Sequence, residues 1–208
     1  MMNKWDYGGY ADKYDMSGVI KAGTGEVMVH DIFNHLPEFM RKAEVIFCDP
    51  PCSQGNLQSF YTKADKKLDN FFKDFQKRLF ECIDEIQPKQ VFIELFKSNR
   101  DAFIAELLKR FKHVDISAST YYHKASNVCW IAHGYNEPGK ALDLHGLDEQ
   151  DAIEKICANG SECIGDLCMG RGLVGFYANK VGRPFVGTEL NENRLAVLLH
   201  RIETGSLK

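Results

Sequence analysis

Apolar residues along the chain follow two spacings, short continuous runs and longer stretches in which they recur every three or four residues. Short runs bounded by turn residues are typical of buried strands, whereas the wider spacing is typical of a helix with one buried face. The runs at 26–30 and 45–48 predict two strands, and the spacing over 68–86 predicts one long amphipathic helix. The first third of the chain therefore alternates between strand and helix.

The same alternation continues, with one interruption. A strand is predicted at 91–95 and a helix over 103–111. Two β-rich runs follow at 114–120 and 127–133, and the few residues between them leave no room for a helix. These two runs therefore predict an antiparallel hairpin.

The last third resumes the alternation after a loop over 134–147, which is rich in glycine and proline. The predicted elements are a helix over 148–158, a strand at 163–167, a helix over 173–181, a strand at 184–188, and a helix over 191–203. Repeated strand-helix units predict an α/β fold, a three-layer sandwich with a mostly parallel sheet of about seven strands. The hairpin adds an antiparallel strand near one edge.

Size and composition indicate one cytoplasmic domain. The chain has 208 residues, of which 44% are hydrophobic, enough for one complete core. It shows neither a signal-peptide pattern nor an apolar run long enough to span a membrane, so we expect a cytoplasmic protein with no membrane partner. The seven cysteines are then expected to be reduced, and without CxxC or HxxxH spacing they predict no metal site.

The net charge of −3 does not provide the broad basic surface that duplex-binding proteins usually present. Contact with nucleic acid would have to be local, for example through the basic stretches at 63–67 and 109–113. Residues 1–25 form an N-terminal arm in which Trp5, Tyr7, Tyr10 and Tyr14 are expected mainly to pack the arm against the domain.

A glycine-rich turn joins a strand to a helix in the segment IGDLCMGRGLVG, residues 164–175. Glycines let the backbone approach a ligand closely, and the helix start offers unpaired N–H groups. Glu189 ends the next strand, where a carboxylate can hold ribose hydroxyls. The pattern predicts an adenosine-bearing cofactor, and because it also satisfies GxGxxG it leaves a nicotinamide enzyme open.

A second motif, Asp49-Pro50-Pro51-Cys52, directly follows a predicted strand. The prolines fix the backbone and lack N–H groups, so the carbonyls of Asp49 and Pro50 are available to a ligand. A carboxylate beside a fixed carbonyl matches the two N–H donors of an exocyclic amino group. The alternative is that the prolines only terminate the strand.

Together these motifs resemble the amino-methyltransferases that act on adenine N6 or cytosine N4, whose catalytic motif reads [DNS]PP[YFW]. The resemblance covers about residues 26–60 and 145–200, and the catalytic segment precedes the cofactor segment, as in the permuted beta group. It implies a circularly permuted, Rossmann-like class I methyltransferase fold with a catalytic half over 26–133 and a cofactor-binding half over 148–208. It also implies S-adenosyl-L-methionine as cofactor and a nucleic-acid base as substrate, with N6 of adenine in DNA favoured and RNA left open.

The resemblance also implies roles for individual residues. The target amine would be held at Asp49 and Pro50, beside Pro51 and Cys52. The cofactor would be bound by Asp31 and Glu189 at its adenosine portion and by the turn over 168–172 at its methionine portion. The full set of expected cofactor-binding residues is Asp31, Asp166, Cys168, Met169, Gly170, Gly172, Glu189 and Asn191.

Cys52 departs from this pattern, because an aromatic ring at its position would stack on a flipped base and a thiol cannot. Pro-Pro-Cys resembles instead the nucleophile segment of cytosine C5 methyltransferases, and Glu94 could match that family's motif glutamate. The C5 family's arginine-rich pattern is missing, so the amino-methyltransferase interpretation is preferred. A C5 enzyme with Cys52 as nucleophile and a degenerate cofactor-binding module stay open.

The chain has only about a dozen residues where the permuted order would place a target-recognition domain. Sequence readout normally needs an element that fits a groove and makes several base contacts. We therefore expect weak selectivity, or selectivity supplied by a second copy of the chain in a homodimer or by a separate specificity partner.

Overall fold

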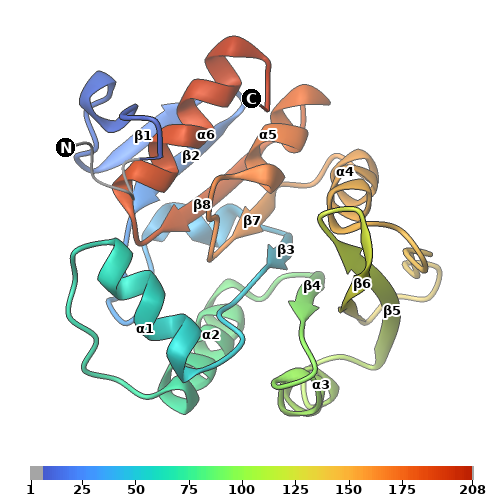
Figure 1. Ribbon diagram of the computed structural model, residues 1–208. Helices are drawn as coiled ribbons and strands as arrows, with labels where there is room; N and C mark the ends of the chain where they lie inside the picture. Colours follow the sequence, from blue (N-terminus) through green and yellow to red (C-terminus); the bar gives the residue numbers. More distant parts are fainter. Residues whose placement is uncertain (1–6, 208) are drawn as a thin grey trace.

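A mixed sheet forms the centre of the protein. The computed structural model describes residues 7–207, and within them the strand order is β1-β2-β8-β7-β3-β4-β6-β5 (Figure 1). The strands are β1 (Val19–Ala22), β2 (Gly25–Val29), β3 (Val45–Cys48), β4 (Gln90–Leu95), β5 (His113–Tyr121), β6 (Lys124–Tyr135), β7 (Ile164–Asp166) and β8 (Phe185–Glu189). Strands β2, β8, β7, β3 and β4 are parallel, whereas β1 and β6 are antiparallel to their neighbours.

Helices cover both faces of the sheet. They are α1 (Gln54–Lys63), α2 (Phe72–Ile86), α3 (Arg100–Leu108), α4 (Glu149–Ala158), α5 (Leu173–Lys180) and α6 (Glu192–Thr204), with short 3-10 helices η1 (Ala11–Lys13) and η2 (Glu38–Lys42). One apolar cluster joins the sheet to α1, α2 and α3, and a second joins its other face to α4, α5 and α6. The predicted three-layer α/β sandwich is confirmed.

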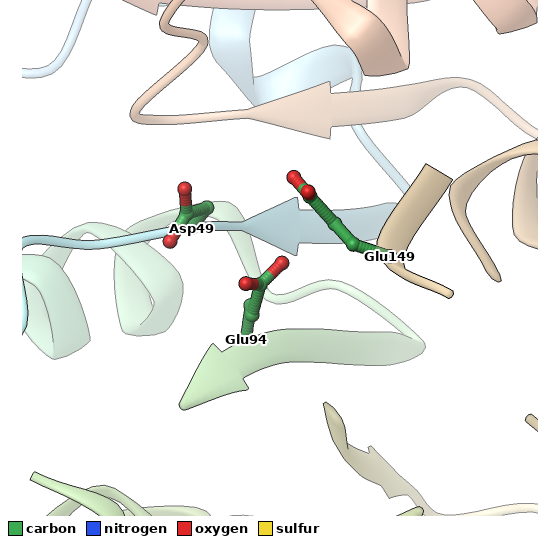
Figure 2. Close-up of side chains that lie close together, drawn as sticks. All are labelled: Asp49, Glu94 and Glu149. Atoms are coloured by element: carbon green, nitrogen blue, oxygen red, sulfur yellow. The ribbon is translucent and has the colours of Figure 1, made fainter. Parts of the chain in front are cut away.

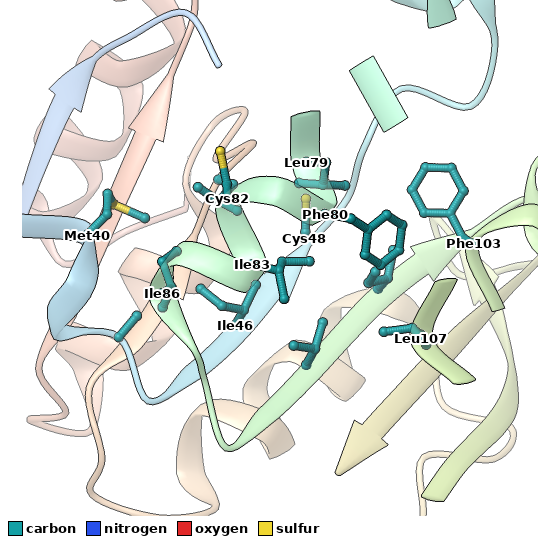
Figure 3. Packing of buried hydrophobic residues seen from close by; sticks show 14 of the residues in the cluster. Met40, Ile46, Cys48, Leu79, Phe80, Cys82, Ile83, Ile86, Phe103 and Leu107 are labelled. Carbon is teal, nitrogen blue, oxygen red and sulfur yellow. The ribbon is translucent and has the colours of Figure 1, made fainter. Parts of the chain in front are cut away.

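Strand β3 shows how the sequence produces these two clusters. Because successive side chains of a strand point to opposite faces, Ile46 and Cys48 pack into the first cluster while Val45 and Phe47 pack into the second. Figure 3 shows the first cluster, where side chains of α2 and α3 lie over the strands. A strand that is buried on both faces reads as a continuous apolar run, which is why the sequence reveals it.

The predicted hairpin and strand-helix alternation are confirmed, but some boundaries differ. Helix α2 begins at Phe72 rather than at residue 68, because Asp74 accepts a hydrogen bond from the Phe71 N–H at 3.0 Å and so caps the helix there. Helix α1, which the apolar spacing does not predict, follows the Asp-Pro-Pro segment. Its signal is the N-cap Ser53, whose hydroxyl accepts the Asn56 N–H at 3.3 Å.

The N-terminal arm contributes to the sheet, which raises the strand count to eight. Strand β1 lies within the expected arm and pairs with β2. Ahead of it, the Tyr10 ring stacks on His200 at 3.9 Å between ring centroids, and the Tyr14 hydroxyl donates to Glu203 at 2.7 Å. The arm therefore packs along α6, while Trp5 lies outside the described residues.

The parallel strands end at the same edge of the sheet, and this edge carries the polar residues of both sequence motifs. Strand β7 lies between β8 and β3, so the carboxyl ends of all three are neighbours. In the part of the chain that the structure describes, no helix has the length and apolar character needed to cross a membrane.

Candidate active site

Four acidic side chains meet where neighbouring strands end. Glu189 ends β8, Asp166 ends β7, Asp49 follows β3, and Glu94 lies one residue before the end of β4. Open α/β sheets bind ligands in the crevice beyond the carboxyl ends of their strands. The fold thus brings together two motifs that are more than a hundred residues apart in the sequence.

The Asp-Pro-Pro turn is fixed by its downstream neighbours. The Cys52 N–H donates to the Asn56 side-chain oxygen at 3.1 Å, and the Ser98 hydroxyl donates to the Cys52 carbonyl at 3.0 Å. Pro50 and Pro51 are buried, whereas Asp49 is half-buried and faces the crevice. The turn therefore presents one carboxylate in a fixed position.

The glycine turn needs glycine at two positions. Gly170 and Gly172 have φ angles of +55° and +73°, which other residues rarely adopt. A Cβ atom at Gly172 would also lie 2.6 Å from Cβ of Leu198. Glu189 stabilises the turn, because its carboxylate accepts the N–H group of Gly170 at 2.7 Å. It also accepts the N–H group of Asn191 at 2.9 Å.

Two cavities meet at this edge. The larger, of about 340 Å³, opens toward Asp166 and the β5–β6 hairpin, and the smaller, of about 90 Å³, opens toward Glu189. Both are lined by Asp49, Phe60, Cys168, Gly170 and Arg194. An extended ligand over the glycine turn would therefore pass beside Asp49.

Burial changes the protonation of the acids in this crevice. It raises the pKa of Asp49 to about 7, although the charge of Arg194 acts in the opposite direction. Burial likewise raises the pKa of Asp166 to about 8 and the pKa of Glu149 to about 8. Desolvated carboxyl groups favour ligands that bring N–H or O–H donors or positive charge.

The predicted residues divide into those that line the cavities and those that support them. Asp49, Asp166, Cys168, Met169 and Gly170 line the larger cavity, and Pro51 and Glu189 line the smaller. Pro50, Cys52, Gly172, Asp31 and Asn191 line neither cavity.

Two of the supporting residues have structural partners. Asp31 accepts the Tyr61 hydroxyl at 2.6 Å and the Phe33 N–H at 3.1 Å. Asn191 caps α6 through the N–H groups of Asn193 and Arg194. Its side-chain amide also donates to the Lys63 carbonyl at 2.7 Å, which ties α6 to α1.

Several lining residues were not found from the sequence. Tyr121 and Tyr122 come from the hairpin tip, Glu149 from the first turn of α4, and Arg194 from α6. The signal for the tyrosines is their position, because two aromatic residues between two β-rich runs lie at the tip of the predicted hairpin. Glu149 and Arg194 look like ordinary solvent-facing residues of a helix until the fold places them in the crevice.

Comparison with known proteins identifies the architecture. M1.HpyAVI superposes with a TM-score of 0.61 at 15% identity, over 86% of this chain and 99% of that chain. A putative DNA modification methylase from Thermus thermophilus superposes with a TM-score of 0.59 at 12% identity, over 86% of this chain and 94% of that chain. The PvuII DNA methyltransferase, which is cytosine-N4-specific, superposes with a TM-score of 0.52 at 8% identity, over 89% of this chain and 95% of that chain.

The chain has the fold of DNA methyltransferases. No family profile and no curated protein sequence matches it. The methyltransferase fold is thus visible in the three-dimensional structure, whereas the sequence retains it only in short motifs.

Proposed function

We propose that the protein is an S-adenosylmethionine-dependent methyltransferase that acts on the exocyclic amine of a base in DNA, with N6 of adenine as the first choice. The observation that carries this proposal is the position of Asp49 at the junction of the two cavities, beside Gly170 of the glycine turn. M1.HpyAVI and the Thermus protein were each also solved with S-adenosylmethionine. The two proposed halves, 26–133 and 148–208, meet along the neighbouring strands β3 and β7.

The crevice residues fit this cofactor. Glu189 is a buried acceptor that lines the smaller cavity, and we expect it to bind the ribose hydroxyls. Asp31 lies close by because strands β2 and β8 pair up to Val29 and Glu189. The turn at 168–172 lies over the start of α5, where free N–H groups suit a carboxylate. When bound, the cofactor supplies an electrophilic methyl group on a sulfonium centre.

The protein's part in the reaction is to orient and desolvate the amine. The Asp49 carboxylate and the Pro50 carbonyl accept its two N–H groups, which fixes the nitrogen lone pair relative to the methyl group. Removing water from the amine makes it more reactive toward that group. The Asp49 carboxylate then accepts the proton that the methylated nitrogen loses.

The second candidate is a cytosine C5 methyltransferase with Cys52 as nucleophile. C5 methylation requires thiolate addition to the ring, whereas an amine attacks the methyl group directly. The amine reaction is favoured because Asp49 lines both cavities and Cys52 lines neither of them.

Substitutions at Cys52 separate these reactions. Cys52→Ser should retain activity within about tenfold, a loss of ~1.4 kcal/mol from altered positioning. Cys52→Tyr should also be active, since its ring restores a stacking surface. Turnover is measured with tritiated cofactor. A denaturation-resistant adduct with 5-fluorocytosine DNA that disappears in Cys52→Ser would instead establish the C5 reaction.

The hairpin tip offers the stacking ring that position 52 lacks. Tyr122 is 61% exposed, lines the larger cavity with Asp49, and contacts the Tyr121 ring edge-on at 4.2 Å. Tyr122 and His123 both have positive φ angles, 59° and 52°. Such strain persists only where its surroundings enforce it, and here Asp148 accepts the His123 N–H at 2.6 Å.

Tyr122→Ala should therefore weaken binding of single-stranded or base-flipped DNA by about 1–3 kcal/mol, the usual range for one base stacked on a ring. Tyr122→Phe keeps the ring and should bind normally. Fluorescence anisotropy of a labelled oligonucleotide measures the effect. Phe71→Ala removes another exposed ring and is the matched control; equal losses in both Ala variants would contradict the role of Tyr122.

The decisive test of the proposed function is mass spectrometry of nucleosides after incubation with labelled cofactor and mixed DNA or RNA. N6-methyladenine in DNA is the expected product, and N4-methylcytosine would correct only the base. Cofactor binding without any methylated nucleoside would identify a degenerate module. Selective methylation that needs a second copy or another subunit would locate the sequence readout outside this short chain.

A further inference from the structure

Three carboxyl groups converge beside the larger cavity. Asp49 follows β3, Glu94 lies on β4 and Glu149 lies in the first turn of α4, so they come from three separate segments. One oxygen of each lies within 4.8 Å of the others. Figure 2 shows the three side chains pointing toward one another across the end of the sheet.

Glu94 has no apparent partner for its charge. It is 0% exposed, and neither of its carboxylate oxygens has a partner at hydrogen-bond geometry. The one donor that interacts with it in the described part of the chain is the thiol of Cys129, a weak donor without charge. A buried polar atom without a partner costs free energy, and a buried charge costs more. Glu94 is aimed at Asp49 and Glu149, which cannot compensate its charge because they are also acidic.

No basic side chain fills the centre of the trio. Arg194 and Arg171 act on Asp49 and Glu149 through their charge, yet none of the ion pairs in the described part of the chain includes a member of the trio. Two of the three acids line the cavity, so its contents can reach them.

We propose that Asp49, Glu94 and Glu149 form a binding site for a divalent cation of the calcium type. Calcium takes carboxylate oxygens at about 2.3–2.6 Å, so oxygens on opposite sides of one ion lie about 4.6–5.2 Å apart. The oxygens of the trio lie within 4.8 Å of one another and are therefore close enough to share one ion. The cavity leaves the remaining coordination positions to water.

The sequence does not indicate this site, because the three acids are far apart in the chain and the cysteine and histidine spacings predict no metal. It stands independently of the proposed methyl transfer. If both are correct, the cation and the target amine share Asp49, and an occupied site withdraws that carboxylate from the amine.

Terbium luminescence tests the site, because a nearby tyrosine ring can sensitise a bound Tb³⁺ ion. Tyr121 lines the larger cavity and interacts electrostatically with all three acids. The wild-type protein should show saturable, one-to-one Tb³⁺ luminescence that Ca²⁺ displaces. Glu94→Gln preserves the shape of the side chain and should weaken binding at least tenfold. Asp151→Asn removes an exposed charge from the same helix as Glu149 and should stay within twofold of the wild type.

Thermal unfolding gives a second readout that does not depend on luminescence or on activity. Ca²⁺ should raise the Tm of the wild-type protein, and at the same Ca²⁺ concentration it should raise the Tm of Glu94→Gln less, because stabilisation of the folded state depends on the ratio of ligand concentration to Kd. Without the ion, Glu94→Gln should unfold no earlier than the wild type. Absence of saturable Tb³⁺ binding, or equal weakening in Glu94→Gln and Asp151→Asn, overturns the proposal.

Discussion

Replacing Asp49 with Ala should abolish methyl transfer while the affinity for S-adenosylmethionine changes much less. In the proposed reaction the carboxylate is the fixed acceptor that orients the target amine, and such a preorganised acceptor contributes most in the transition state. We expect turnover to fall by about a thousandfold, which corresponds to ~4 kcal/mol. Single-turnover kinetics and calorimetry separate the loss of chemistry from any loss of binding.

Matched variants make this experiment specific. Asp49→Asn keeps one acceptor oxygen and the shape of the side chain, so it should retain more activity than Asp49→Ala. Asp69→Ala removes an exposed carboxylate that pairs with Lys67 and should leave turnover unchanged. Near wild-type turnover in folded Asp49→Ala would show that the Asp-Pro-Pro segment only terminates strand β3.

The fold was predictable because local patterns determine most of it. Strand β3 is a continuous apolar run, β4 is apolar except for Gln90 and Glu94, and the apolar residues of α2 recur at helical spacing. Helix α1 is not predicted from apolar spacing because its sequence is mostly polar and it buries only Leu57 and Tyr61. Strand β1 is not predicted because it has only four residues, of which one is buried. The order of the strands depends on contacts between distant segments, which periodicity does not encode.

The candidate site was only partly predictable for the same reason. Asp49, Gly170 and Glu189 lie in or near short motifs whose neighbouring residues indicate a ligand-binding turn. Glu149 lies in helix α4, outside both motifs. Nothing near it in the sequence indicates that it approaches Asp49. The acidic trio therefore appears only when β3, β4 and α4 are placed together.

Replacing Glu189 with Ala should weaken binding of S-adenosylmethionine by about 1.5–3 kcal/mol, the range for a charged hydrogen-bonding partner. The variant loses the acceptor that we propose for the ribose. It also releases the N–H groups of Gly170 and Asn191 that the carboxylate now holds, so the glycine turn loses its support as well.

Glu189→Gln separates these two contributions. Its amide keeps one acceptor oxygen, so one of the two backbone N–H groups stays bound and the affinity should fall between those of the wild type and Glu189→Ala. Glu192→Ala, an exposed residue in the first turn of α6, is the control and should bind normally. Titration calorimetry measures all four proteins. An unchanged affinity in Glu189→Ala, or a preference of the wild type for a nicotinamide dinucleotide, would show that the turn at 168–172 serves a different ligand and would remove the basis for methyl transfer.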